Sequence, residues 1–421
     1  MASSPCNNAP TSPALLFYDA IINNDIDKLR KMVEIYKFDL NAKFPEVRRS
    51  NHKDLCPVHL VSFKGYFSIL HYLIQSGVDV NQSTTTLFRQ PLHHAAMSHQ
   101  LSCSQLLINA GGQIDAKDTF GNTPLHYAAE DGENNLLTLL LQNGANSDSQ
   151  DITNKTPLMK ATRSGRIGAV KRLLGVGCNV NVKDKNEDTA LHYAARQGSA
   201  DLIIMLLKYD ARIDAQNQWG LTPLMEAVSY SQQSVVQILI RSKCDLYKRD
   251  YRTGDTALHV AVRKNYVHLV EMLLKAGKWY IEYNFNNFGE SFVHDAVWYN
   301  RCELVRLFLM HNYNFDYPAK KLASGTEKSP FQLVLERGHL ELAKVLSRVC
   351  CYWSKNSNTV KRIEFQELEE VKSLRQWCRK VIRRQLGFHI YEKLQKINLP
   401  PALIEYIQLE DIKWGPKMSV K

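Results

Sequence analysis

Hydrophobic and polar positions along this chain follow a block that repeats about every 33 residues. Each block holds a short apolar helix pattern after a Thr-Pro-Leu-His mark, then a second, leucine-rich helix pattern. In one block the second pattern carries Leu136, Leu137, Leu139, Leu140 and Leu141. A single block cannot bury its own apolar face, so the pattern predicts blocks stacked side by side into a solenoid.

The mark at the start of each block keeps its register over most of the chain. The marks begin at Cys56, Gln90, Thr123, Thr156, Thr189, Thr222, Thr256, Ser291 and Ser329. The steps are 33 residues in the middle of the chain and lengthen to 35 and 38 at the last two marks. Agreement at many positions over several blocks makes the repeat a specific signal.

Each part of the block has a physical role. Threonine caps a helix through its hydroxyl, and proline suits the first helical position. An alanine pair such as Ala128 and Ala129 keeps the first helix thin, so that neighbouring blocks can stack closely. A glycine after the second helix is expected in the left-handed conformation. At the turn before the next mark, Asn154 replaces glycine and tolerates a positive φ. Glu187 replaces glycine in another turn and is expected to be more strained at a positive φ.

This block strongly resembles the ankyrin repeat. The resemblance implies an all-α solenoid of helix pairs joined by β-turn or hairpin fingers. We expect a repeat domain over 13–351, with a degenerate first cap unit at 13–41 and eight or nine repeats after it. Residues 1–12 are polar and are expected to be disordered, and they do not have the pattern of a secretory signal.

Histidine recurs at one position of the block. These residues are His59, His93, His126, His192, His259 and His294. A metal ligand or a general base would not recur in every block, so we predict a structural role beside the capping threonine. Cys178, Cys244 and Cys302 are interpreted as small core hydrophobes.

No constellation in the sequence predicts catalysis, a metal or a cofactor. The nine cysteines show no CxxC spacing, and the paired ligands of a structural zinc site are missing. An odd number of cysteines without a signal peptide predicts reduced thiols, and therefore a cytoplasmic or nuclear location. We expect a protein that is not an enzyme.

The net charge of +11 raises the question of nucleic acid as a partner. More than half of this excess lies in 352–421, where 14 Lys and Arg accompany 8 Asp and Glu. A nucleic-acid-binding solenoid would need a continuous basic stripe with interleaved aromatic residues across the repeats. We therefore expect no nucleic-acid partner. We also expect no membrane span, because no run of eighteen apolar residues occurs.

A different pattern follows the repeats. Residues 352–366 are predicted to be a linker. In the next segment Leu374, Cys378 and Ile382 lie at i, i+4 and i+8, so they share one face of an amphipathic helix. Pro400 can begin a further apolar helix but cannot lie inside one.

Together these two halves resemble a SOCS box, expected at 367–412 and followed by a tail at 413–421. The first half is similar to the motif that binds elongin B and elongin C, which implies contacts from Ser373, Leu374, Trp377, Cys378 and Ile382. The second half resembles the cullin-5 selection motif, which implies contacts from Ile397, Leu399, Pro400, Pro401, Leu403 and Tyr406. Asn398 takes the place of the first proline of that motif, which leaves open whether cullin-5 or cullin-2 is used.

The layout as a whole resembles the ankyrin repeat and SOCS box family. The resemblance implies a substrate-recognition subunit of a cullin-RING ubiquitin ligase, whose partners are elongin B, elongin C, cullin-5 with a RING protein, and an unidentified target protein. The alternative is an ankyrin scaffold outside any ligase, whose C-terminal helices only cap the solenoid. A scaffold would have no need of Leu399 and Pro400 after a Leu-xxx-Cys helix.

Target-binding positions are predicted from the register of the repeat. Turn tips and exposed positions of the first helices give Phe120, Arg163, Arg196, Trp219, Arg263, Lys264, Phe288 and Trp298. Aromatic and arginine side chains are common interface anchors. We expect a groove that is basic in the middle repeats and aromatic toward the C-terminal ones, and that takes an acidic, partly apolar segment. The alternative is that the aromatic residues at the tips pack on neighbouring turns.

Overall fold

The structure is a computed structural model. It describes residues 13–37, 39–44, 55–279, 284–311, 313, 315 and 328–347. The chain divides into two compact units, one up to Arg212 and one from Ile213 onward, here called the first and the second unit. The predictions for 1–12, 352–366, 367–412 and 413–421 concern residues outside the described ranges.

The described part of the first unit consists of helix pairs. Its helices are α1 (Pro13–Ile22), α2 (Ile26–Tyr36), α3 (Pro57–Lys64), α4 (Phe67–Gln75), α5 (Pro91–Met97), α6 (Leu101–Asn109), α7 (Pro124–Asp131), α8 (Asn134–Gln142), α9 (Pro157–Arg163), α10 (Ile167–Gly175), α11 (Ala190–Gln197) and α12 (Ala200–Lys208). From α3 to α11, each first helix packs on the first helix of the next repeat, and the second helices do the same. The pair α1 and α2 occupies the segment predicted as a degenerate first unit.

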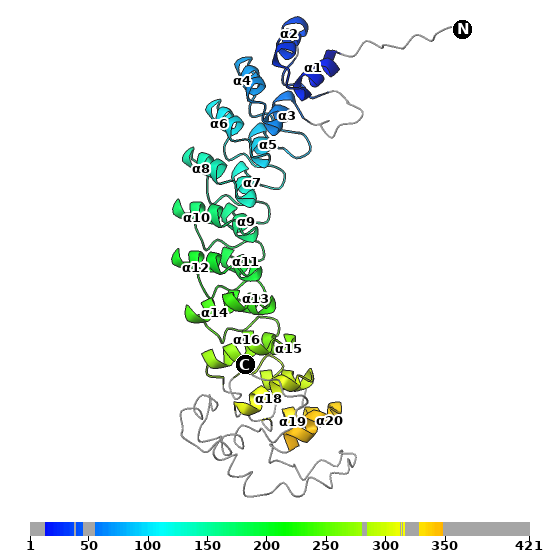
Figure 1. Cartoon of the computed structure of the whole chain (residues 1–421), viewed down its shortest axis with the longest axis vertical. Coiled ribbons are helices and arrows are strands. Elements are labelled where there is room, and N and C mark those ends of the chain that lie inside the picture. The colour runs from blue at the N-terminus through cyan, green and yellow to red at the C-terminus, as the bar shows by residue number, and fades with distance from the viewer. Residues whose placement is uncertain are drawn as a thin grey trace, which may run out of the picture. The chain divides into compact units, whose positions relative to one another are not determined.

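The second unit continues the same pattern. Its described helices are α13 (Pro223–Ser229), α14 (Gln233–Arg241), α15 (Ala257–Lys264), α16 (Val267–Ala276), α17 (Phe292–Trp298), α18 (Cys302–Met310), α19 (Pro330–Arg337) and α20 (Leu340–Ser347). Within each unit the first and second helices form two layers, which Figure 1 shows as two columns of ribbons. The prediction of an all-α repeat solenoid is confirmed. Among the described residues, β-type pairing is limited to an isolated bridge between Phe285 and Ser291.

The helix starts follow the chemistry of the mark. Thr123 precedes α7 in an extended conformation, and Pro124 fills the first helical position. Nδ1 of His126 accepts the backbone N–H of Thr123 at 3.1 Å and lies 3.0 Å from its hydroxyl. The other ring nitrogen, Nε2, lies 3.0 Å from the carbonyl oxygen of Lys155 in the next repeat. The predicted structural role of the repeated histidine is thus confirmed, since the ring joins a helix start to the neighbouring repeat.

The loop between one repeat and the first helix of the next, here called a finger, is closed by its own hydrogen bonds. The Asp118 carboxylate accepts the backbone N–H groups of Phe120 and Asn122, both at 2.9 Å. Gly121 has a φ of +72°, and a Cβ there would lie 2.7 Å from the backbone nitrogen of Ile152 in the next finger. The predicted substitutes for glycine also adopt positive φ, which is 60° at both Asn154 and Glu187.

The second unit departs from the thin alanine core. Trp279, Phe292, Phe308 and Tyr313 are buried together. The Phe292 ring meets Phe308 and Tyr313 edge to face, with a centroid distance of 5.2 Å in each case. Trp279 Nε1 donates to the carbonyl of Leu273 at 2.9 Å, so its polar group is satisfied. This aromatic core lies where the repeat spacing lengthens, a feature that the sequence pattern alone did not explain.

No helix in the described residues is long and apolar enough to cross a membrane.

Candidate interaction surfaces

Three of the predicted target-binding residues lie in the first unit. Phe120 lies at a finger tip with 46% of its surface exposed. Arg163 is exposed at the end of α9. Arg196 is different, because its Nη1 pairs with Asp188 Oδ2 at 2.7 Å and its guanidinium lies over the ring of Tyr193. Phe120 and Arg163 therefore face solvent, whereas Arg196 is engaged within its own repeat.

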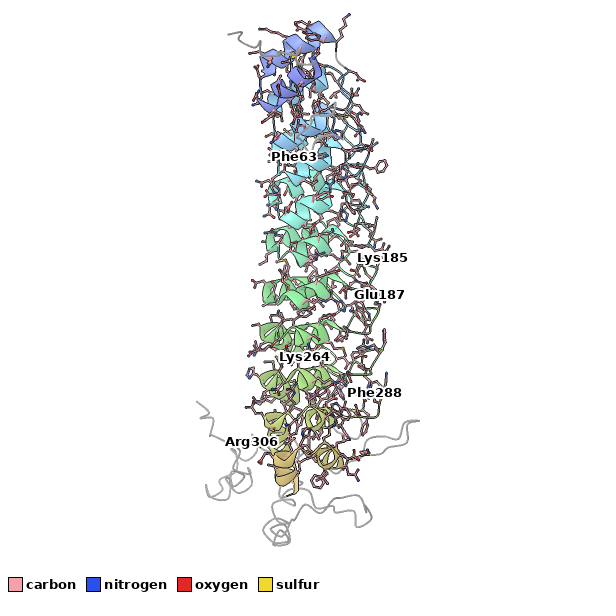
Figure 2. The ribbon with its side chains drawn as sticks, turned by 90° about the vertical axis from the view of Figure 1, so that its right-hand side faces the viewer. Phe63, Lys185, Glu187, Lys264, Phe288 and Arg306 are labelled. Atoms are coloured by element: carbon pink, nitrogen blue, oxygen red, sulfur yellow. The ribbon has the colours of Figure 1, made fainter. Side chains whose placement is uncertain are left out.

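The other five predicted residues lie in the second unit. Trp219 and Phe288 are finger-tip residues and are 44% and 59% exposed. Trp298, at the end of α17, is 41% exposed and carries the guanidinium of Arg337 at 3.3 Å from its ring centroid. Lys264, at the end of α15, is exposed, and Figure 2 shows it between the finger edge and the edge that carries Arg306.

Arg263 is the centre of a buried ion-pair cluster. Its Nε donates to Asp295 at 3.0 Å, and its Nη2 donates to Asp255 at 3.0 Å, with a second bond from Nη1 to Asp255. Both carboxylates are almost fully buried, with 2% of Asp255 and 4% of Asp295 exposed. Desolvation raises the pKa of Asp295 to about 7, against the attraction of Arg263. These contacts give Arg263 a structural role that its register position did not predict.

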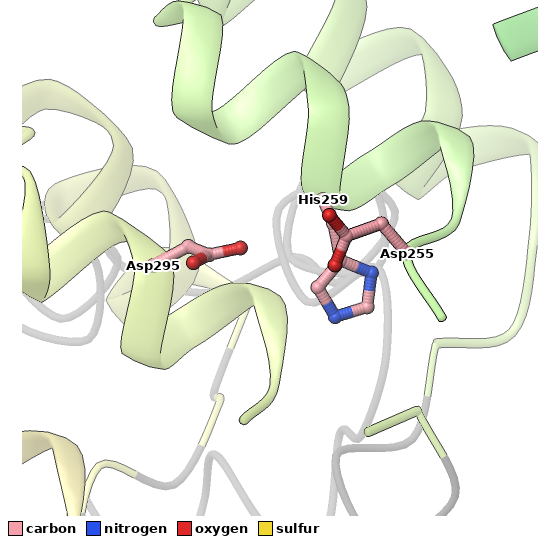
Figure 3. A group of neighbouring side chains, drawn as sticks. All are labelled: Asp255, His259 and Asp295. Carbon is pink, nitrogen blue, oxygen red and sulfur yellow. The ribbon is translucent and has the colours of Figure 1, made fainter. Parts of the chain in front are cut away.

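The same cluster has the residue types of a metal site. Figure 3 shows Asp255, His259 and Asp295 together, and one ligand-type atom from each lies within 4.8 Å of the others. The positive charge at this position comes from the Arg263 guanidinium, which binds both carboxylates. Desolvation lowers the pKa of His259 to about 4, which keeps the ring neutral. Both carboxylates of the cluster are therefore bound by Arg263, and Nδ1 of His259 accepts the backbone N–H of Thr256 at 3.2 Å.

One exposed finger-tip residue of the second unit was missed. Tyr251 is 63% exposed. Its finger has one residue more between Asp250 and the capping Thr256 than the finger from Asp118 to Thr123 has, so a rule that counts back from the glycine passes over it. Counting forward from the first residue of the finger also misses it, because Tyr251 stands one position after Asp250, whereas Phe120 stands two positions after Asp118.

The prediction that three cysteines are small core residues is confirmed for two of them. Cys178 and Cys244 are buried, and desolvation raises the pKa of each thiol to about 12. Cys302, at the start of α18, is partly exposed, so the prediction of a core position is wrong for this residue.

The predicted ligase-binding residues lie outside the described residues. The predicted elongin contacts are Ser373, Leu374, Trp377, Cys378 and Ile382. The predicted cullin contacts are Ile397, Leu399, Pro400, Pro401, Leu403 and Tyr406. Their roles stay predictions.

Similar proteins share parts of this chain. The 64 residues that match "Probable E3 ubiquitin-protein ligase XBOS33" of Oryza sativa subsp. japonica are 38% identical and cover 15% of this chain and 12% of that protein. "Ankyrin repeat domain-containing protein 37" of Homo sapiens is 33% identical over 101 residues, 24% of this chain and 59% of that protein. Among solved structures, the human ASB11 ankyrin repeat domain is 26% identical with a TM-score of 0.49, and the match covers 54% of this chain and 100% of that one. The chain thus spans less than two thirds of either curated relative.

Family models match both parts of the sequence. The model for ankyrin repeats matches residues 58–151, 92–184, 158–250 and 243–321, which together span more than half of the 421 residues. The model for the SOCS box matches residues 370–408, behind the repeats. With stacked helix pairs in both described units and a SOCS box after them, the chain belongs to the ankyrin repeat and SOCS box family.

Proposed function

We propose that this protein is the substrate-recognition subunit of a cullin-RING ubiquitin ligase. In this proposal the ankyrin repeats bind the target protein, and the SOCS box recruits elongin B, elongin C and cullin-5. The observation that carries the proposal is the SOCS box match at 370–408, C-terminal to ankyrin matches that end at 321.

The chain would promote ubiquitin transfer only by holding the target in position. A RING protein on the cullin would bring charged ubiquitin, and the repeats would hold a lysine of the target near the reactive thioester. Holding two reactants together raises their effective concentration, which can replace chemical groups supplied by the adaptor. In the described residues, the groups that resemble a catalytic site have structural contacts: His126 joins a helix start to the next repeat, and Asp255 and Asp295 bind Arg263.

The contacts with the ligase would come from one face of the predicted helix in the SOCS box. Leu374, Cys378 and Ile382 share that face, which would be an exposed apolar patch until a partner covers it. Arg375 lies one position after Leu374 and therefore falls about 100° away around the helix. This pair of neighbours offers a matched test within one helix.

Replacing both Leu374 and Cys378 with alanine is expected to abolish copurification of elongins B and C. Losing one buried leucine typically costs about 2–5 kcal/mol, so binding should weaken by at least about thirtyfold. The measurement is the amount of elongin recovered per tagged full-length chain after coexpression.

Arg375→Ala is the control and should retain elongin at the level of the unchanged chain. Both variants should keep the helical circular dichroism and melting temperature of the repeats. Undiminished elongin recovery with the double variant would refute the proposed ligase role and favour a scaffold outside any ligase.

Replacing Leu399 and Pro400 with alanine is expected to separate the cullin from the elongins. The variant should still recover elongins B and C, because the first helix is unchanged, and it should lose cullin-5. Asn398→Pro restores the residue usual at that place of the motif and should hold or strengthen cullin binding. The measurement is quantitative immunoblotting of both cullins in the same pull-down. Recovery of cullin-2 in place of cullin-5 from the unchanged chain would contradict the cullin-5 assignment.

A further inference from the structure

Three successive fingers of the second unit each present an exposed aromatic side chain. Trp219, Tyr251 and Phe288 are 44%, 63% and 59% exposed, and we call this row the finger ridge. Figure 2 shows Phe288 at the finger edge of the unit, on the side away from Arg306. Single exposed apolar residues are ordinary, whereas a run of large ones on adjacent elements is typical of an interaction surface.

The ridge is fixed by contacts between the fingers. The backbone N–H of Tyr251 donates to the carbonyl of Trp219 at 2.9 Å, and the N–H of Asn287 donates to the carbonyl of Thr253 at 2.8 Å. Gly220 has a φ of +78°, and a Cβ there would lie 2.7 Å from Cγ of Tyr251. The Tyr251 ring therefore rests on the glycine of the preceding finger and still exposes most of its surface. A surface ordered in advance loses little entropy when a partner binds.

One finger position that holds a carboxylate in the first unit is mostly neutral along the ridge. The finger residue that is aspartate at three successive positions of the first unit, Asp118, Asp151 and Asp184, is Asn217, Asp250 and Asn286 in the second unit. The remaining carboxylate, that of Asp250, accepts the N–H of Arg252 at 2.9 Å and the hydroxyl of Thr253 at 2.6 Å. It is thus turned into its own finger by hydrogen bonds.

Basic side chains accompany the aromatic ones. The finger that carries Tyr251 also carries Lys248, Arg249 and Arg252, and the two arginines are exposed. Between Lys248 and Thr256 these three basic residues face two aspartates, Asp250 and Asp255, and Asp255 is buried and bound by Arg263, so the exposed charge of this finger is mainly positive. Arginine and aromatic side chains are the residue types that most often anchor a protein partner, and the charge favours an acidic one.

The spacing of the ridge suits one kind of backbone. Helices packed side by side lie about 8–10 Å apart, so successive finger tips have a similar spacing. A polyproline II segment has three residues per turn and rises about 3.1 Å per residue, so it presents one face about every 9 Å. A side chain at every third residue of such a segment would meet one tip of the ridge.

We propose that the finger ridge binds an extended acidic segment of the target, with an apolar side chain at every third residue. Apolar side chains pack beside Trp219, Tyr251 and Phe288, and the intervening carboxylates face Arg249 and Arg252. This inference rests on the proposed function in one respect: it takes the occupant of the ridge to be the protein that the ligase modifies.

The test uses the purified full-length chain and fluorescein-labelled peptides in an anisotropy titration. The periodic peptide has about twelve residues, glutamate at most positions and leucine or tryptophan at every third. A first control peptide has the same composition with its apolar residues placed together. A second has lysine in place of glutamate, and a single-stranded DNA oligonucleotide serves as a third probe.

The periodic acidic peptide should bind at least tenfold more tightly than either control peptide. The triple variant Trp219→Ala, Tyr251→Ala and Phe288→Ala should weaken it at least tenfold. Arg252→Ala should weaken binding and reduce its salt dependence, and Arg306→Ala, an exposed arginine of α18, should change neither. If the triple variant fails to fold, the comparison of Arg252→Ala with Arg306→Ala tests whether the peptide binds at the finger ridge.

Equal affinity for the periodic and the rearranged peptide would overturn the proposed spacing. Undiminished binding by the triple variant would place the site elsewhere, and tighter binding of the oligonucleotide would make the ridge a nucleic-acid surface. Elongin recovery is measured separately on the same chain. A chain that binds the peptide without elongin would refute the ligase role alone, and one that binds elongin without the peptide would refute the ridge alone.

Discussion

Arg263→Ala is expected to lower the free energy of unfolding of the repeats by about 3–5 kcal/mol, the usual result of removing one partner from a buried ion pair. The guanidinium holds Asp255 and Asp295, and both carboxylates would stay buried without a cation. Urea unfolding of the full-length chain, followed by circular dichroism, measures the change. Because this variant should unfold easily, a loss of target binding by it would carry no information about the binding surface.

Lys264→Ala is the matched control, because Lys264 is the next residue of the chain and is exposed. It should change the free energy of unfolding by no more than about 0.5 kcal/mol. Adding Asp295→Asn to the Arg263→Ala variant should recover part of the loss, because asparagine needs no proton when it is buried.

The pH dependence of Arg263→Ala has a definite sign. The pKa of Asp295 is already about 7 in the folded chain, above its ordinary 3.8, and the loss of Arg263 would raise it further. A carboxyl group with a raised pKa contributes stability in acid that is lost as the pH rises through that pKa. The difference from the unchanged chain should therefore grow as the pH rises above about 7, where Asp295 ionises in the unchanged chain and stays protonated in the variant. Unfolding at the same urea concentration as Lys264→Ala would contradict a structural role for the ion pair.

Much of the fold could be predicted from the sequence because each repeat contains its own helix-start and turn residues. Thr123 and Pro124 start α7, and the same types of residue start α9, the first helix of the next repeat, 33 positions later. His126 was predicted to lie beside the capping threonine, and this needed only its recurrence in the block. The positive φ at Asn154 and Glu187 followed from the place of glycine in the other fingers.

The interactions between repeats could not be predicted in this way. Arg263 follows the small residues of its helix at a position that is expected to be exposed, but Asp295 reaches it from the next repeat. Phe292 takes the place that proline or alanine has in the other marks, and its ring meets Phe308 of α18 and Tyr313 after that helix. Such contacts depend on which residues of different repeats coincide in space, and a pattern read one repeat at a time does not contain that information.

The exposure of the finger-tip residues could be predicted from the sequence only in part. Exposure of Phe120, Trp219 and Phe288 was predicted from the register and is confirmed, whereas the contribution of Tyr251 to the same row depends on the hydrogen bond between fingers. The alternative reading, in which tip aromatics pack on neighbouring turns, is partly correct for Tyr251, which rests on Gly220. Packing at the base and exposure at the tip occur together in this residue.

Acidification from about pH 7 to pH 5 is expected to remove most of the stability of the repeats. Desolvation lowers the pKa values of His126, His259 and His294 to about 4 and that of His94 to about 3, from an ordinary 6.5. A lowered pKa means that the unfolded chain takes up the proton first, so this stability is present above 6.5 and is lost as the pH falls toward 4. At pH 5 each of these histidines would remove about 2 kcal/mol.

Asp295 changes the free energy of unfolding in the opposite direction, by less than the four histidines together. Its raised pKa favours the folded state in acid, but it is a single carboxyl group set against four histidines. Since a folded protein is typically stable by about 5–15 kcal/mol, the histidines should dominate. The midpoint of urea unfolding, measured on the full-length chain across this pH range, should fall steeply.

His126→Met tests whether the repeated histidine causes this acid sensitivity. Two blocks of the same chain already carry methionine at this position, Met159 and Met225, and both side chains are buried behind their capping threonines. At pH 7 the variant should be less stable than the unchanged chain, because it lacks the hydrogen bonds of the ring to Thr123 and Lys155, worth about 1 kcal/mol each. Between pH 7 and pH 5 it should lose about 2 kcal/mol less than the unchanged chain, because one site of preferential protonation in the unfolded state is gone. Parallel pH profiles for the two chains would show that the acid sensitivity has another source, whereas profiles that converge as the pH falls would assign it to the ring that joins one repeat to the next.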